Sequence, residues 1–191
     1  MGTLVYGAMA SLDGYTADVS GNFDWARPDS EVHAFVNELE RSVGTYLYGR
    51  RMFETMRYWD TAPVEPDARE DRPQVEHEYA RIWQAADKVV YSSTLESVGT
   101  ARTRLERVFD VEEVRALVGA AEGEVGIGGP TLAVPALLAG LVDSFWLVQV
   151  PVVVGGGTPV WPADLRLDLE LVEERRFGGG AVFVRYDVAG R

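Results

Sequence analysis

The chain has 191 residues, of which 47% are hydrophobic and 25% are charged. This length predicts a single domain over residues 1–191 with a sizeable core, and the absence of cysteine excludes disulfides and cysteine-ligated metal sites. The formal net charge of −12 argues against phosphate-rich partners, so we expect neither nucleic-acid nor membrane-surface binding.

Residue types and their spacing exclude further classes. The two histidines, His33 and His77, lie far apart in the sequence, so we expect no metal site. Lys88 is the only lysine, and it does not stand in a P-loop pattern. No apolar run approaches the roughly 20 residues of a membrane span, and the N-terminus lacks the pattern of a signal peptide. We therefore expect a soluble, cytoplasmic protein.

Strand and helix patterns alternate along most of the chain. Apolar and β-branched runs predict five strands, over 4–9, 45–48, 88–91, 124–127 and 142–154. Apolar residues at helical spacing predict helices over 31–41, from 50, and over 76–86, 111–121 and 130–138. We expect an exposed loop over 61–73, and a hairpin of two strands, 167–176 and 181–186, around a glycine turn. This order predicts an α/β fold with a mostly parallel sheet and an antiparallel edge.

The segment Gly126-Ile127-Gly128-Gly129-Pro130-Thr131 joins a predicted strand to a predicted helix. Adjacent glycines let a diphosphate approach the backbone, and the N–H groups of a helix N-terminus attract anions. The segment is not the Rossmann fingerprint, because Thr131 stands where the third glycine belongs. A tight turn without a ligand is the alternative interpretation.

Two other predicted strands end in polar turns. Gly49-Arg50-Arg51 places two cations in the first turn of a helix, where they oppose the dipole unless an anion or a residue such as Glu54 compensates them. Ser92-Ser93 follows the next strand and could donate to a phosphate, although small hydroxyl residues are also common in turns. Because the carboxyl ends of parallel strands meet at one edge of a sheet, we expect these turns and the glycine segment to line one crevice.

Two acidic residues are candidates for proton transfer. Asp13 lies in the turn Ser11-Leu12-Asp13-Gly14 after the first strand, and Glu31 lies in the first turn of a predicted helix. A carboxyl whose pKa is raised by partial burial can deliver a proton near neutral pH. The alternatives are a turn-forming aspartate and a glutamate that favours the helix dipole.

Taken in order, these segments resemble the dihydrofolate reductase-like superfamily. The similarity is greatest to stand-alone relatives of the reductase domain at the C-terminus of the bifunctional riboflavin-pathway deaminase–reductase. It covers almost the whole chain and rests on segments 11–14, 49–50, 88–93, 127–132, 140–143 and 151–157 and on the closing hairpin. The resemblance implies a three-layer α/β/α fold with a mixed, mostly parallel eight-stranded sheet, NADPH bound across the strand ends, a small-molecule substrate and a homodimer.

The resemblance also implies roles for particular residues. Arg50, Ser92 and Ser93 would hold the 2′-phosphate of NADPH. Gly128 and Gly129 would cradle its diphosphate, with N–H donors from the helix starts at Arg51 and Thr131. The other cofactor contacts carried over are Ala8, Leu12 and Gly14, which would border the nicotinamide, and Gly49, Ile127, Pro130 and Leu132 in the two glycine turns.

This sequence departs from the family pattern in three ways. Met52 stands where dihydrofolate reductases usually carry a threonine. Glu31 matches their substrate-binding carboxylate, but Asp29 is close enough to compete for that role, whereas Asp13 matches the aspartate that lies at the substrate in riboflavin-type reductases. The zinc deaminase half of the bifunctional enzyme has no counterpart here.

The resemblance predicts an NADPH-dependent reductase that transfers a hydride to a C=N or C=O carbon of a small heterocyclic or carbonyl-type substrate, similar to the 5-amino-6-(5-phosphoribosylamino)uracil reductases. Asp13 or Glu31 would supply the proton, directly or through water. A non-catalytic nucleotide-binding or regulatory module on the same fold is one alternative, and a flavin-linked oxidoreductase is another.

Overall fold

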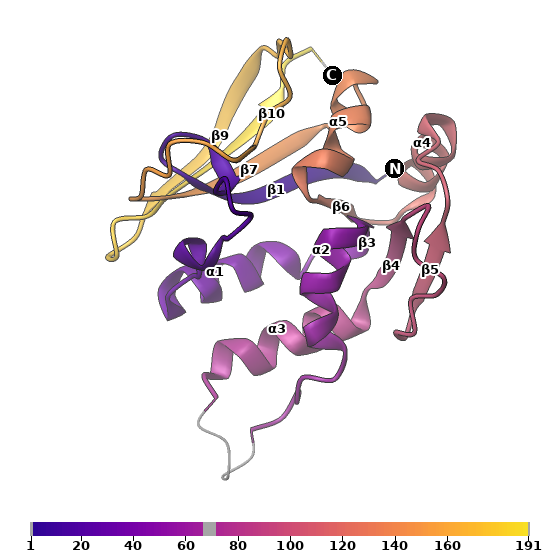
Figure 1. Cartoon of the computed structure of the whole chain (residues 1–191), viewed down its shortest axis with the longest axis horizontal. Coiled ribbons are helices and arrows are strands. Elements are labelled where there is room, and N and C mark those ends of the chain that lie inside the picture. The colour runs from indigo at the N-terminus through magenta and orange to yellow at the C-terminus, as the bar shows by residue number, and fades with distance from the viewer. Residues whose placement is uncertain (1, 67–71, 191) are drawn as a thin grey trace.

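Eight strands form the central sheet of the computed structural model, which describes residues 2–66 and 72–190 (Figure 1). In spatial order they are β5 (Thr103–Glu106), β4 (Asp87–Tyr91), β3 (Val43–Gly49), β6 (Glu124–Gly128), β1 (Thr3–Ser11), β7 (Ser144–Val150), β10 (Val182–Val188) and β9 (Leu169–Arg176). Neighbours from β5 to β7 run parallel, and β10 runs antiparallel to both β7 and β9. The predicted mixed, mostly parallel sheet with a C-terminal antiparallel hairpin is confirmed.

Helices cover both faces of this sheet. In the described segments they are α1 (Ser30–Glu40), α2 (Arg50–Met56), α3 (Gln74–Ala85), α4 (Val111–Ala120) and α5 (Pro130–Leu138), with two 3₁₀ turns, η1 (Asp24–Ala26) and η2 (Arg57–Asp60). Figure 1 shows α1 and α3 below the sheet and α4 and α5 above it. None of the helices in the described segments is long and apolar enough to cross a membrane.

Strand side chains alternate between the two faces and so build a core on each. Leu4 and Tyr6 of β1 pack into the core under α4 and α5, whereas Val5 packs into the core under α1. A third cluster joins β3 to α2 and α3, and it includes Tyr48 and the fully buried Trp83. The sheet is therefore fixed from both sides, and its strand ends are held in place.

The helices begin in two different ways. Asp29 caps α1 by accepting the Val32 N–H, and Asp110 caps α4 by accepting the N–H groups of residues 112 and 113. In contrast, α2 and α5 begin at Gly49 and Gly129, and neither start has a side-chain cap hydrogen bond. Their first turns therefore keep N–H groups that the chain does not satisfy.

The structure differs from the predicted elements at several places. The short edge strand β5 was not expected, because its four residues include only one apolar side chain. The predicted strand 142–154 pairs only as far as Val150, because Pro151 has no N–H to donate to the ladder. Two short strands that were also not expected, β2 (Tyr15–Ala17) and β8 (Thr158–Pro159), pair with each other beside the strand ends.

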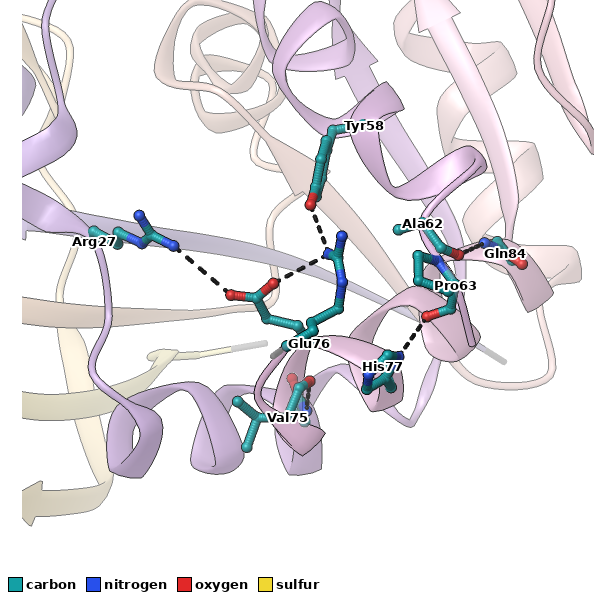
Figure 2. A network of polar contacts seen from close by, with 10 residues as sticks. Arg27, Tyr58, Ala62, Pro63, Val75, Glu76, His77 and Gln84 are labelled. Carbon is teal, nitrogen blue, oxygen red and sulfur yellow. Dashed lines mark hydrogen bonds and ion pairs between the residues drawn. The ribbon is translucent and has the colours of Figure 1, made fainter. Parts of the chain in front are cut away.

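The predicted loop 61–73 is only partly described, since residues 67–71 lie outside the described residues. The part before them is held against α3 by polar contacts (Figure 2). Gln84 donates to the Ala62 carbonyl oxygen at 2.9 Å, and the Pro63 carbonyl oxygen lies 2.8 Å from Nδ1 of the buried His77. His77 is thus a core residue bound to the backbone.

Lys88, the only lysine, is buried in the core beneath β4. Its ammonium group donates to the carbonyl oxygens of Trp83 (3.1 Å) and Ala86 (2.9 Å), and it lies 4.1 Å from the centre of the Trp83 ring. These carbonyls belong to the C-terminal end of α3, where a cation compensates the helix dipole. The lysine therefore joins α3 to the sheet.

Candidate functional site

The turns singled out in the sequence lie side by side. In the parallel ladders, Tyr48 is opposite Gly128, and Gly49 is opposite Tyr91, which immediately precedes Ser92. The segments 49–51, 92–93 and 128–131, called the three turns below, therefore leave neighbouring strands at the same edge of the sheet. They lie at one edge of the sheet, as the topology rule predicts, and the crevice that they are expected to line stays a prediction.

The glycine turn after β6 requires its glycines. Gly129 has φ +94°, a conformation that strains other residues. A Cβ atom on Gly128 would lie 2.9 Å from a ring carbon of Tyr48, and one on Gly129 would lie 3.4 Å from Cβ of Met52. The starts of α2 and α5 therefore approach each other closely, and the backbone between them is bare.

This bare backbone leads into the first turn of α5. Pro130 has no N–H, and helix geometry leaves the N–H groups of Thr131 and Leu132 without intrahelical acceptors. Thr131 is exposed. A helix start with free N–H groups, a favourable dipole and no side-chain cap can bind an anion.

Two arginines lie in the adjacent first turn of α2. Arg50 forms an ion pair with Glu54 at 3.2 Å, but both side chains are almost half exposed, so this pair contributes little. Arg51 is exposed, and its side chain has no partner in the described part of the chain. In a chain with a net charge of −12, these cations are available to an anionic ligand.

The serine turn after β4 is partly occupied by its own contacts. The Ser92 hydroxyl oxygen accepts the N–H groups of Thr94 (3.2 Å) and Leu95 (3.1 Å), whereas Ser93 is exposed. Arg107, which the sequence reasoning did not select, donates to the carbonyl oxygens of Ser92 and Leu95. It therefore fixes this turn and adds positive charge behind it. In the sequence, the only indication of this role is that Arg107 directly follows β5, a strand that was not predicted.

The end of β1 lies between the glycine turn that follows β6 and the loop that follows β7. Ala8 is opposite Leu147 in the ladder, Leu12 is 62% exposed, and Gly14 has φ +86°. These three predicted neighbours of the nicotinamide are at the same edge as the three turns, because β1 pairs with β6. Their contact with a cofactor stays a prediction.

Asp13 does not have the raised pKa that proton delivery near neutral pH would require. Its pKa is lowered, chiefly by a hydrogen bond from the Ser11 side chain and also by the backbone N–H groups of Gly155 and Val154, which stabilise the carboxylate. The carboxylate is exposed and faces the loop after β7. Burial is too slight to outweigh these hydrogen bonds, so the condition under which Asp13 would donate a proton near neutral pH is not met.

The second carboxylate candidate contacts the closing hairpin. Glu31 accepts the Gly178 N–H at 2.9 Å and lies 3.7 Å from the Arg175 guanidinium. Asp29, its competitor in the sequence, is the N-cap of α1. Glu31 remains half exposed, so it stays a candidate for proton transfer.

The described residues contain no cluster of three or more histidine, aspartate or glutamate side chains that could hold a metal ion.

Comparison with known proteins agrees with this geometry. The sequence profile of the RibD C-terminal domain matches residues 3–183. The protein YyaP of Bacillus subtilis (strain 168) is 28% identical over 180 residues, which cover 92% of this chain and 89% of YyaP.

Solved structures show the same fold. A protein from Shewanella sp. PV-4, assigned by its name to riboflavin biosynthesis, superimposes with a TM-score of 0.73 and 21% identity, covering 97% of this chain and 98% of its own. Dihydrofolate reductase from Enterococcus faecalis, in a complex with NADP(H), superimposes with a TM-score of 0.62 and 15% identity, covering 98% and 96%. The predicted dihydrofolate reductase-like fold and the resemblance to RibD-type reductases are confirmed.

Proposed function

Since the chain belongs to the family of the RibD C-terminal domain, we propose that it is a cytoplasmic, NADPH-dependent reductase that delivers a hydride to a C=N or C=O carbon of a small heterocyclic or carbonyl-type molecule. Family and fold support an oxidoreductase. NADPH, the acceptor and the compartment are the parts that we add.

One observation carries the proposal, namely the side-by-side position of the three turns. A dinucleotide phosphate presents two anionic groups, a diphosphate and a 2′-phosphate. The glycine turn offers the N–H groups of Thr131 and Leu132, at a helix start without a side-chain cap, to the first. The first turn of α2 offers Arg50 and Arg51, and the neighbouring serine turn offers Ser93, to the second. The residues therefore fit the cofactor.

Each group of residues would have its own role toward the cofactor. NADPH, when bound, would supply the hydride and its electron pair. Gly128 and Gly129 would admit the diphosphate, Arg50, Ser92 and Ser93 would hold the 2′-phosphate, and Ala8, Leu12 and Gly14 would border the nicotinamide. By fixing the cofactor against the end of β1, these residues would orient it toward the acceptor.

The product also needs a proton. Asp13 and Glu31 are the carboxyl groups at this edge of the sheet, and each could act directly or through a water molecule. The lowered pKa of Asp13 makes it a weak proton source at neutral pH. The half-exposed Glu31 is therefore the better candidate of the two.

A fluorescence titration tests the proposal. NADPH is expected to bind more tightly than NADH by about tenfold or more, because charge-assisted hydrogen bonds to the 2′-phosphate contribute roughly 1.5–3 kcal/mol. Equal affinities would remove Arg50 and the serines from the cofactor site. No binding of either nucleotide would overturn the proposal, and a yellow protein with bound flavin would favour a flavin-linked oxidoreductase.

A nucleotide-binding module without turnover is the second candidate. It is favoured by the observation that Asp13 and Glu31 both accept backbone N–H groups, which gives each carboxylate a role outside catalysis. NADPH oxidation in the presence of a panel of imines and carbonyl compounds separates the two candidates. Tight NADPH binding without oxidation by any acceptor would favour the module.

We also propose a homodimer, as the resemblance implies. Every residue of the edge strand β9 is exposed, and Leu171 and Val172 are more than half exposed. An edge strand with exposed apolar side chains can pair with a second copy. Light scattering during size-exclusion chromatography tests this proposal, and a mass of one chain, 21.0 kDa, would overturn it.

A further inference from the structure

The loop after β1 is bound along its length to the loop after β7. The Leu12 N–H donates to the Val152 carbonyl oxygen at 2.8 Å, and the Val160 N–H donates to the Gly14 carbonyl oxygen at 3.0 Å. Next to these contacts, β2 pairs with β8. Residues 11–17 and 151–160, called the clasp below, thus join two segments that are far apart in the sequence.

Two side chains make contacts across the clasp for which the structure gives distances: the Thr16 hydroxyl donates to the Thr158 carbonyl oxygen at 3.2 Å, and the Asp13 carboxylate accepts two N–H groups. Its Oδ1 accepts the Val154 N–H at 3.2 Å, and its Oδ2 accepts the Gly155 N–H at 2.8 Å. Two consecutive N–H groups that converge on one anion are an effective carboxylate-binding arrangement. Gly155 can present its N–H in this way because its φ of +75° is accessible to glycine.

The clasp carries two exposed apolar side chains at the edge where the nicotinamide is proposed to bind. Leu12 is 62% exposed and Val153 is 67% exposed. The Leu12 N–H is bonded to the residue before Val153, so the two loops hold these side chains at a fixed separation. Apolar side chains on a fixed backbone can form one wall of a pocket for a planar ring.

We propose that Asp13 is a positioning residue: its carboxylate locks the clasp and so fixes the pocket wall formed by Leu12 and Val153. This inference rests on the proposed function for the identity of the pocket, but the lock itself is a property of the free protein. It gives Asp13 a role different from proton transfer.

Three features support positioning over proton donation. Both carboxylate oxygens accept backbone N–H groups, which stabilises the charged form. The pKa of Asp13 is lowered, first by the Ser11 side chain. Finally, β1 lies between β6 and β7, and the carboxylate is bonded on the β7 side, away from the glycine turn that follows β6.

The first test measures amide hydrogen exchange of Val154 and Gly155 by NMR in the free protein. In Asp13→Asn the side-chain amide can accept only one N–H, so we expect exchange at one or both amides to be about fivefold faster, as for one lost hydrogen bond. Asp13 is exposed, so the variant is expected to fold. Asp18→Asn is the matched control, because Asp18 is an aspartate of the same region whose carboxylate bonds only within its own loop. Unchanged exchange in Asp13→Asn would overturn the proposal.

The second test separates positioning from proton donation during NADPH oxidation with a reducible imine or carbonyl compound. A positioning role predicts that Asp13→Asn raises KM severalfold and keeps the pH profile of kcat. It also predicts that Asp13→Glu does not restore KM, because the longer side chain cannot reach both N–H groups in the same geometry. A loss of kcat of about 100-fold or more that Asp13→Glu reverses would identify a proton donor and overturn the proposal.

The two tests also distinguish this inference from the proposed function. If the wild-type protein neither binds NADPH nor oxidises it, the proposed function fails, and the exchange measurement still decides whether Asp13 locks the clasp. If NADPH binds and is oxidised but exchange in Asp13→Asn is unchanged, only the inference about Asp13 fails.

Discussion

At the ends of β3 and β6, the helices α2 and α5 begin without a side-chain cap, and the first turn of α2 carries Arg51, which has no side-chain partner in the described residues. At the ends of β1 and β7, in contrast, polar groups of the two loops bond to one another. The first region contains the three turns, and the second contains the clasp. Both lie at the same edge of one sheet, and they differ in how they become rigid.

The three turns are fixed from below. Tyr48 and Trp83 pack in the core under β3 and β4, and Lys88 ties α3 to the same strands. The N–H groups of the α5 start are therefore free to face a ligand without loss of order in the loops. The clasp is ordered by contacts between its own two segments, such as those of Asp13.

Polar groups at the edge of the sheet where the strands end therefore have two different uses. Groups that are held in place by a core can be left without partners, and they are then ready for an anion. Groups that hold loops together are already bonded, and they fix the shape of those loops. The four substitutions below test the two regions, from the largest expected effect to the smallest.

Lys88→Ala tests whether the three turns depend on the core. The substitution removes a fully buried side chain and leaves the Trp83 and Ala86 carbonyls without their donor. We expect a loss of about 2–4 kcal/mol in the free energy of unfolding, measured by urea denaturation. Lys88→Met keeps most of the volume and should lose less. An unchanged stability of Lys88→Ala would show that the turns are fixed in another way.

Arg50→Ala tests whether the three turns bind the cofactor. NADPH affinity should fall by about tenfold or more through loss of a charged contact, whereas NADH affinity should stay nearly unchanged. Arg115→Ala is the matched control, because Arg115 lies on α4 and pairs only with Glu112 there. An equal loss for both nucleotides would mean that the arginine supports the turn and does not read the 2′-phosphate.

The three turns were more predictable from the sequence than the clasp was. The glycine turn, the arginine pair and the serine pair each follow an apolar strand, and the rule that parallel strands end at one edge places them together. Local pattern and topology are enough for that step. The antiparallel hairpin was also predicted from its glycine turn, whereas the number of eight strands and the three layers were implied by the family resemblance.

The clasp was not predictable, because its contacts join residues such as Asp13 and Gly155 that are 142 apart in the sequence. A turn-forming aspartate has the same local pattern whether its carboxylate is free or bonded to a distant loop. The sequence therefore could not show that hydrogen bonds lower the pKa of Asp13. The strands β2, β5 and β8 were missed because two to four residues carry too little periodicity.

Glu40 tests how the stability of the core below the three turns depends on pH. Its pKa is raised to about 7, because burial disfavours the charged form and the carboxylate of Glu124 adds to the rise. The folded protein therefore binds a proton that the unfolded chain releases near its ordinary value of 4.5. The stability from protonated Glu40 is complete below that value and is lost as pH rises through about 7.

The free energy of unfolding should thus fall by about 1–2 kcal/mol from pH 5 to pH 8 through this group. Glu40→Gln should remove most of the decline and make the protein more stable than the wild type at pH 8. Urea denaturation of both proteins at the two pH values measures the effect. An equal decline in wild type and variant would show that Glu40 ionises without cost in the folded state.

Glu31→Gln is expected to have the smallest effect on stability. It tests whether Glu31 only holds the closing hairpin or also delivers the proton. A glutamine oxygen can still accept the Gly178 N–H, and the contact with Arg175 at 3.7 Å is between half-exposed groups. The free energy of unfolding should therefore change by less than about 0.5 kcal/mol. If Glu31 only holds the hairpin, NADPH oxidation should keep its rate as well. A loss of kcat of about 100-fold with unchanged stability and NADPH affinity would instead show that Glu31 delivers the proton, because a glutamine keeps the shape of the side chain but has no acidic proton, and unchanged stability would show that loss of the Arg175 contact is not the cause.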